Sequence, residues 1–219
     1  QAVVSTRDPD EAGFAALAER AVAMARAAPE DPFAGLADPA ALATDWPELD
    51  LLDDTVMEVD RLTERAQAVE AAARAVPGIT RSGGASASWG LGGMVLATST
   101  GFSGHFLASR HGLSCSAIAG TGTGMERDYE FTSALHLEDL ADPEWVGRQA
   151  GERAVRRLSP RKMDTARLPV VYDPRVAGSL VGHLAAAVNG SAVARGTSFL
   201  RDRRGKPLFA SGISIIDDP

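Results

Sequence analysis

The chain has 219 residues, of which 45% are apolar and 23% charged, a composition typical of a soluble globular protein and not of a disordered or fibrous one. Its formal net charge of −7 opposes non-specific binding to nucleic acid or to an anionic membrane. We expect a cytoplasmic protein, because no apolar run approaches the roughly 20 residues of a membrane span, no signal sequence is visible, and the single cysteine, Cys115, excludes disulfides and a thiolate zinc cluster.

The N-terminal part predicts two helices joined by a long connection. Asp8 and Pro9 predict the N-cap and first position of an amphipathic helix over residues 9–28. Residues 29–55 are rich in proline and acidic residues, lack any sustained period, and predict a surface connection held down by its few apolar residues. A second helix is predicted over residues 57–76, with one apolar face made of Val59, Leu62, Ala66, Val69 and Ala73.

Residues 79–134 predict an antiparallel meander of four or five strands with glycines at the turns. The glycine-rich stretch 83–93 is interpreted as a flexible turn and not as a phosphate cradle. Gly120, Gly122 and Gly124 are evenly spaced and precede a charged strand, so they predict a hairpin loop and not a dinucleotide site. In that last strand the acidic residues alternate with Met125, Arg127, Tyr129 and Phe131, which predicts one acidic face and one aromatic face, the acidic one being Glu126, Asp128 and Glu130.

The C-terminal part predicts a helix, a strand and a helix. Asp142-Pro143 caps a helix that runs to about Leu158, residues 168–173 form a short strand, and the last helix runs from Asp173-Pro174 to Asn189-Gly190. The sequence therefore predicts an α+β fold over residues 1–219, with helices layered on a mostly antiparallel sheet. Because the chain begins without Met and ends after the start of an apolar run, we expect a fragment of a larger protein.

Several residues could carry chemistry. A nucleophile would be Ser114 or Cys115, activated by His105 or His111, although Cys115 shares the apolar strand phase and is favoured as a buried, inert thiol. His136 has no partner that the sequence reveals. The basic stretch Arg153, Arg156, Arg157, Arg161 and Lys162 could bind phosphate or an acidic partner, but a solvated helix end is favoured.

Four segments, in this order, carry a family resemblance that covers most of the chain from about Asp8 onward. They are GMERDYEFT, DPEWVG, RRLSPRKM and the long run from LPVVYDPRVAGSLVGHLAAAVNG to RDRRGKPLF. Together they resemble the TldD/PmbA family, also called modulators of DNA gyrase. The resemblance implies that the chain lacks the family's first N-terminal strands and its C-terminal β-rich domain.

The resemblance also locates a motif. In the catalytic branch, the helix corresponding to residues 174–190 carries His-Glu-x-x-x-His, which supplies two zinc ligands and a general base for peptide hydrolysis. Here the same positions read His183-Leu184-Ala185-Ala186-Ala187-Val188. Leu184 cannot accept a proton and Val188 cannot bind a metal, so His183 is a weak candidate for a metal ligand and is favoured as a hydrogen-bonded core residue beside an apolar ladder of Val176, Leu180, Leu184 and Val188.

This pattern resembles the PmbA (TldE) branch, which lacks the metal motif. The resemblance implies a chain without catalytic residues or a metal of its own, paired with a zinc-bearing TldD-type subunit in a two-chain protease that acts on unfolded peptides. Two alternatives stay open: a stand-alone metal-dependent hydrolase that uses His183 with ligands such as His105 or His111, and a protein that modulates DNA gyrase, for which direct DNA binding is unattractive given the net charge.

Overall fold

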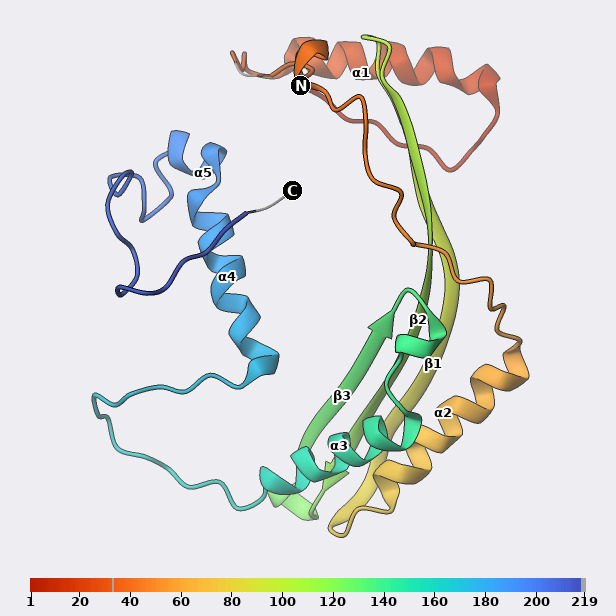
Figure 1. Cartoon of the computed structure of the whole chain (residues 1–219), viewed down its shortest axis with the longest axis vertical. Coiled ribbons are helices and arrows are strands. Elements are labelled where there is room, and N and C mark those ends of the chain that lie inside the picture. Colours follow the sequence, from red (N-terminus) through yellow and green to blue (C-terminus); the bar gives the residue numbers. More distant parts are fainter. Residues whose placement is uncertain (33, 218–219) are drawn as a thin grey trace. The chain divides into compact units, whose positions relative to one another are not determined.

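The computed structural model describes residues 1–32 and 34–217. The chain divides into two compact units, residues 1–161 and residues 162–219, and each is described by itself (Figure 1). Within the described residues, we find no helix that combines the length and the apolar character needed to cross a membrane.

The first unit is built on one antiparallel sheet in the order β1-β2-β3. The strands are β1 (Ile79–Ala97), β2 (Ser103–Ala119) and β3 (Glu126–Ala134). The predicted antiparallel α+β fold is confirmed. The predicted number of four or five strands was wrong, because three long strands occupy residues 79–134. The β1–β2 hairpin continues beyond the end of β3, whose last residue, Ala134, pairs with His111 (Figure 1).

Glycines account for the wrong strand count. The stretch 83–93 is not a flexible turn but the middle of β1, and its glycines allow close approach: a Cβ on Gly93 would collide with the carbonyl oxygen of Phe106 on β2. Turns occur instead at Gly101, with φ of 94°, and at Gly120 and Gly122, with φ of 76° and 60°. The predicted hairpin loop at 120–124 is confirmed, and it contains the 3₁₀ turn Gly122–Gly124.

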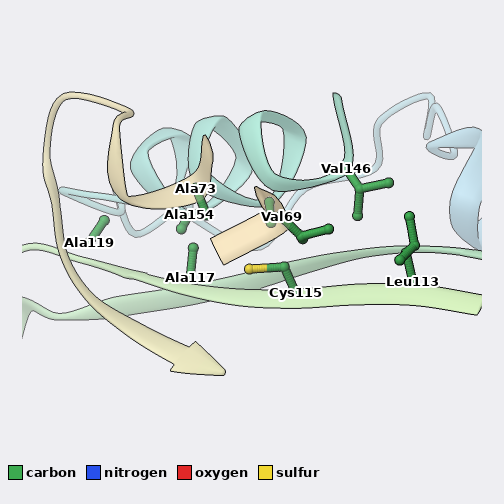
Figure 2. Packing of buried hydrophobic residues seen from close by; sticks show 9 residues of the cluster. Val69, Ala73, Leu113, Cys115, Ala117, Ala119, Val146 and Ala154 are labelled. Atoms are coloured by element: carbon green, nitrogen blue, oxygen red, sulfur yellow. The ribbon is translucent and has the colours of Figure 1, made fainter. Parts of the chain in front are cut away.

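Two helices cover one face of this sheet. α2 (Val59–Arg74) and α3 (Pro143–Arg156) confirm the second and third predicted helices, and Asp142 caps α3 by accepting hydrogen bonds from the backbone N–H groups of Glu144 and Trp145. The core between helices and sheet consists mainly of small side chains (Figure 2). Its buried members are Val69, Ala73, Leu113, Cys115, Ala117, Ala119, Val146, Ala150 and Ala154.

The N-terminal helix starts later than predicted. Asp10, and not Asp8, caps a 3₁₀ turn (Glu11–Gly13), and α1 (Phe14–Ala27) follows it; α1 has no buried residue. Asp8 instead accepts a hydrogen bond from the backbone N–H of Asp10. The predicted connection 29–55 is irregular where it is described, apart from a short 3₁₀ turn (Pro39–Ala41).

The second unit contains α4 (Pro174–Val188) and α5 (Gly190–Ala194). Asp173 caps α4 as predicted, and Asn189 ends it but also caps α5 by accepting from the backbone N–H groups of Ser191 and Ala192. The predicted strand 168–173 was wrong: this stretch is irregular and exposed, with Val171 94% exposed. A strand needs a hydrogen-bonded neighbour, and no described residue pairs with it.

Candidate functional site

Residues 183–188, which the family resemblance aligns with the metal motif, lie on α4. His183 is exposed there, so the prediction of a buried, hydrogen-bonded core histidine was wrong. Leu184 is half-buried, and both Leu184 and Val188 line a pocket of about 740 Å³ together with Leu208, Phe209, Ile215 and other residues. Two residues of the apolar ladder, Leu184 and Val188, therefore share a pocket with the C-terminal segment, while His183 does not line it.

The residues around His183 do not fit a zinc ion. The two positions that would supply the proton acceptor and the second nitrogen ligand carry aliphatic side chains that pack in an apolar pocket. Within residues 1–32 and 34–217, no group of three or more His, Cys, Asp or Glu side chains could together hold a metal ion. We therefore derive no chemical step through a metal bound to this chain.

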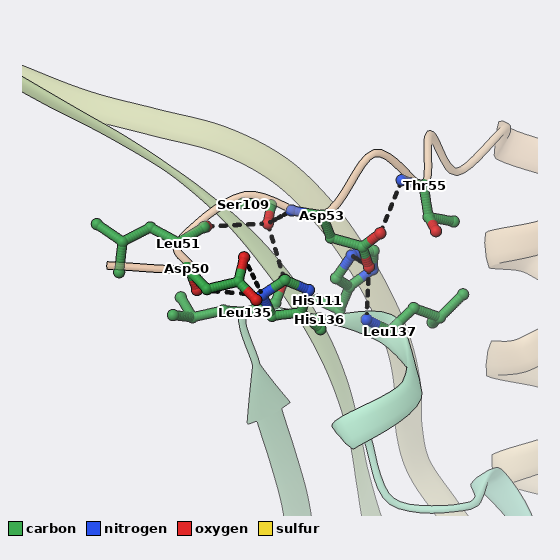
Figure 3. Close-up of polar contacts among 9 residues, drawn as sticks. All are labelled: Asp50, Leu51, Asp53, Thr55, Ser109, His111, Leu135, His136 and Leu137. Atoms are coloured by element: carbon green, nitrogen blue, oxygen red, sulfur yellow. Dashed lines mark hydrogen bonds and ion pairs between the residues drawn. The ribbon is translucent and has the colours of Figure 1, made fainter. Parts of the chain in front are cut away.

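A polar cluster in the first unit joins three distant segments (Figure 3). Asp53 Oδ2 lies 3.0 Å from His111 Nε2 and accepts a hydrogen bond of 2.6 Å from the backbone N–H of Leu137. Asp53 Oδ1 accepts one of 2.7 Å from the backbone N–H of Thr55. His111 is 1% exposed, so the end of the 29–55 connection is attached to the centre of β2 by a buried contact.

Ser109 completes this attachment. Its Oγ donates to the carbonyl oxygen of Leu135 at 2.8 Å and accepts from the backbone N–H of Asp53 at 2.7 Å. Its own backbone N–H donates to the carbonyl oxygen of Leu51 at 2.9 Å. Polar contacts therefore hold the end of the connection against the sheet, beside a pocket in which apolar residues of the connection such as Leu51 lie with Phe106 and Leu107 of β2. Since the Ser109 hydroxyl is committed to backbone groups, the cluster is an attachment point and not a Ser-His-Asp nucleophile.

The ionisation of this cluster follows from its hydrogen bonds. The backbone N–H of Leu137, then Thr55 and the nearby His111, hold the pKa of the Asp53 carboxyl well below its ordinary value. His136, which seemed without a partner in the sequence, lies 3.1 Å from the carbonyl oxygen of Asp50 and 3.4 Å from its carboxylate. The contact with the Asp50 backbone, followed by nearby carboxylates, raises the pKa of His136.

The proposed nucleophiles are not brought together. Cys115 is buried on the helix-facing side of β2, which confirms the predicted burial of its thiol, and burial followed by the charge of Glu70 raises the pKa of this thiol to about 11. Ser114 points to the opposite side and forms a 2.8 Å hydrogen bond with Ser86. His105 is exposed on the distal part of the hairpin, and His111 contacts Asp53.

The alternation along β3 is confirmed, but its orientation was not foreseen. The acidic residues face α3: Glu130 pairs with Arg153, while Arg157 lies 3.4 Å from Glu126 and 3.5 Å from Asp128. The solvated helix end predicted for the basic stretch was therefore wrong for Arg153, which is mostly covered and pairs with Glu130 on the sheet, whereas Arg157 contacts carboxylates of the sheet and stays 56% exposed. Tyr129 and Phe131 face away from the helices.

Most of the chain is similar to known proteins of one family. Residues 53–158 match the central domain of the PmbA/TldA metallopeptidases and residues 165–219 match their C-terminal domain. The chain belongs to the PmbA/TldD family. It is 38% identical to the metalloprotease PmbA homolog of Haemophilus influenzae and 37% identical to metalloprotease PmbA of Escherichia coli O157:H7, in each case over 98% of this chain. The chain spans about half the length of these relatives, 48% of each.

Solved structures agree with this assignment. A proposed modulator of DNA gyrase from Bacteroides thetaiotaomicron superposes with a TM-score of 0.80 at 26% identity, covering 94% of this chain and 48% of that one. TldE from Thermococcus kodakarensis superposes with a TM-score of 0.63 at 16% identity, covering 91% of this chain and 44% of that one, and supports the fold alone. The resemblance seen in the sequence to the PmbA/TldD family is thus confirmed.

Sequence reasoning missed two residues that organise the first unit, Asp53 and Ser109. Asp53 lies in a stretch with many acids, and its partners Ser109 and His111 are more than 50 residues away. A single sequence contains no signal that residues so far apart contact one another. The one available signal was the position of Ser109 and His111 in the same strand phase as Leu113 and Cys115, which predicts that both face the core.

Proposed function

We propose that this PmbA/TldD-family chain is part of a PmbA (TldE)-like subunit that holds no catalytic zinc of its own and works beside a zinc-bearing TldD-type subunit. Together the two cleave unfolded peptides in the cytoplasm. The observation that carries the proposal is the pair Leu184 and Val188, two aliphatic residues that line an apolar pocket where the catalytic branch has glutamate and histidine. The proposal is also supported by the name of two relatives, metalloprotease PmbA, which are 37–38% identical to this chain.

The test compares the intact protein alone, its TldD-type partner alone, and the two mixed. We expect zinc analysis to find the metal with the partner, and a fluorogenic unfolded peptide to be cleaved rapidly only by the mixture. Strong zinc-dependent cleavage by this protein alone would overturn the proposal in favour of a stand-alone hydrolase.

His183→Ala separates the same two readings at one residue. Because His183 is exposed and lies outside the apolar pocket, we expect the variant to fold normally and to leave cleavage by the mixture unchanged. His105→Ala, which also removes an exposed imidazole, is the matched control. Loss of activity in His183→Ala alone, with an unchanged melting temperature, would assign a ligand role to His183. Direct association of the intact protein with gyrase would instead favour the reading as a gyrase modulator.

A further inference from the structure

The side of the sheet that α2 and α3 leave uncovered has a distinct composition. We call this side the outer face and define it by the strand positions that alternate with the core residues. Ser86 on β1 pairs with Ser114 on β2, which pairs with Phe131 on β3, and the positions two residues away in each direction continue the same face. From Ile118 to Arg110 its members are Arg81, Gly84, Ser86, Ser88 and Gly90 on β1, Arg110, Gly112, Ser114, Ser116 and Ile118 on β2, and Arg127, Tyr129, Phe131 and Ser133 on β3. Beyond Arg110 the same strand phase continues along the two-stranded hairpin with Ala108 and Phe106 on β2 and Gly92 and Met94 on β1.

All charges on the outer face are positive. Arg81, Arg110 and Arg127 are exposed there, whereas the carboxylates of β3 lie on the helix-facing side and pair with Arg153 and Arg157. A chain with a net charge of −7 thus presents a face without a carboxylate among its described residues. This separation favours an acidic ligand over a basic one.

The arginines lie at the two ends of the stretch from Ile118 to Arg110. Arg81 and Arg127 both pair with Ile118, so they flank β2 at one end. Arg110 lies eight residues along β2, which corresponds to about 27 Å at the rise of an extended strand. The Nη1 of Arg110 donates to Ser133 Oγ at 3.2 Å, which fixes the direction of this side chain across the face.

Between these ends the surface carries small polar residues and is partly aromatic. Ser86 and Ser114 join through a 2.8 Å hydrogen bond, and Gly112 has no side chain that would rise above them. On β3 the rings of Tyr129 and Phe131 stack with centroids 6.3 Å apart and remain 50% and 55% exposed. Small polar residues beside an exposed aromatic pair leave room for an extended chain and offer apolar area to its side chains.

We propose that the outer face binds an extended, acidic stretch of polypeptide. One carboxylate pairs with Arg81 and Arg127, a second carboxylate about eight residues along the bound chain pairs with Arg110, and an apolar side chain between them packs on Tyr129 and Phe131. This inference rests on the proposed function and narrows it, because it makes this chain the subunit that selects and holds the peptide.

A single-stranded nucleic acid is the rival polyanion, since arginines and aromatic rings also bind phosphates and bases. A peptide is favoured because the cations lie at the two ends and not along the path, whereas a nucleic acid carries a charge at every nucleotide. The net charge of −7 also repels a polyanion more strongly than a peptide with two carboxylates.

The experiment measures fluorescence anisotropy of labelled nine-residue peptides with the intact protein in the absence of the TldD-type partner. The probe has glutamates at positions 1 and 9 and leucine at position 5; the comparison peptides move the second glutamate to position 4 or replace both with lysine. We expect the probe to bind at least about fivefold more tightly than either, and to bind more weakly as salt rises.

Substitutions on the outer face test whether the peptide binds there. Arg81→Gln, Arg110→Gln and Arg127→Gln should each weaken it about two- to fivefold, and Tyr129→Ala/Phe131→Ala about tenfold. Arg61→Gln, on the exposed side of α2, is the matched control and should change nothing. Thermal unfolding of each variant shows that the fold is retained.

Several results would overturn the inference: equal binding of the lysine peptide, unchanged binding in all three arginine variants, tighter binding of a single-stranded oligonucleotide, or dimerisation of the protein that these variants abolish. This experiment measures binding and not cleavage, so a result that contradicts peptide binding to the outer face does not by itself contradict the proposed function. If the peptide binds but the mixture of this protein with its TldD-type partner cleaves nothing, only the proposed function is contradicted.

Discussion

Asp53 joins three segments of the first unit that are distant in sequence. Both of its carboxylate oxygens accept backbone hydrogen bonds, and one of them also contacts the buried ring of His111. A carboxylate held in this way favours its ionised form. The residue therefore links the acid–base state of one side chain to the position of the 29–55 connection.

We predict that Asp53→Asn lowers the melting temperature at pH 7 by several degrees, because an amide oxygen cannot replace both carboxylate contacts. The folded-state pKa of Asp53 lies below its ordinary value of 3.8. Its stabilising effect is therefore present above pH 3.8 and is lost as the pH falls below that value toward the folded-state pKa. Thermal unfolding between pH 7 and pH 2 should thus show the difference between wild type and variant shrinking in acid.

Asp54→Asn is the control for this prediction, since it removes a neighbouring exposed carboxylate. It should leave the melting temperature within about one degree of the wild type at every pH. A difference between Asp53→Asn and wild type that persists unchanged at pH 2 would contradict the assigned role of the ionised carboxylate.

The thiol of Cys115 should react only when the protein unfolds. It is 2% exposed, and burial raises its pKa to about 11, so about one part in ten thousand is thiolate at pH 7. A matched position lies next to it: Ser114→Cys in a Cys115→Ala background places a thiol on the outer face. We expect this thiol to react with a disulfide reagent at least about a hundredfold faster than Cys115, and equal rates would show that the core opens readily.

At the scale of elements, the packing of α2 against α3 depends on two glycines. A Cβ on Gly147 would collide with the carbonyl oxygen of Val69, and one on Gly151 would lie 2.7 Å from a methyl group of Val76. The helices thus approach so closely that only a hydrogen fits at these positions. The alanines Ala150 and Ala154 on the same helix are fully buried for the same reason.

Gly147→Ala should therefore destabilise the protein by about 1–3 kcal/mol or more, although alanine is the better helix former. Gly178→Ala on α4 is the matched control, since nothing lies within 4 Å of the added methyl group. There the helix propensity alone acts, and we expect no loss and up to about 1 kcal/mol of gain. Urea unfolding of both variants measures the contrast, and a neutral Gly147→Ala would show that the helices can move apart.

The elements themselves divide into those that local sequence determines and those that it does not. The caps at Asp142 and Asp173 and the hairpin at Gly120–Gly124 were predicted correctly, because capping and turn formation act over a few residues. Residues 168–173 have strand-forming side chains but no pairing neighbour, and the glycines of β1 resemble turn residues although the adjacent strand requires them. Both errors concern partners distant in sequence.

The candidate site shows the same division. That Leu184 and Val188 lie on one helix could be predicted from the sequence, because the pattern of that helix is local. The exposure of His183, the pairing of Arg153 with Glu130, and the Asp53–His111 contact all depend on which surfaces meet in the folded chain.

At the scale of the whole molecule, the segment between the two units is an exposed stretch of irregular backbone. Residues 161–172 are all exposed and irregular, and they include Arg161, Lys162 and Arg167. We predict that limited trypsin digestion cuts here first and releases a product that ends at Arg161 or Lys162. Arg153 and Arg156 in α3 are internal controls, because cleavage requires local unfolding of the helix. Early cleavage at Arg153 would contradict the packing of α3 on the sheet.

The part of the β1–β2 hairpin that extends beyond β3 gives one pair of strands two different environments. Near Cys115 the backbone of β2 is hydrogen-bonded on both sides and covered by helices, whereas around Phe106 the hairpin has two strands and exposed side chains. Amide deuteration should accordingly be slow at the proximal end and fast at the tip of the same two strands. The two-stranded tip of the hairpin would then be flexible, and the part covered by the helices would be rigid. The tip would be able to bend toward an incoming molecule without disturbing the core that the alanines form.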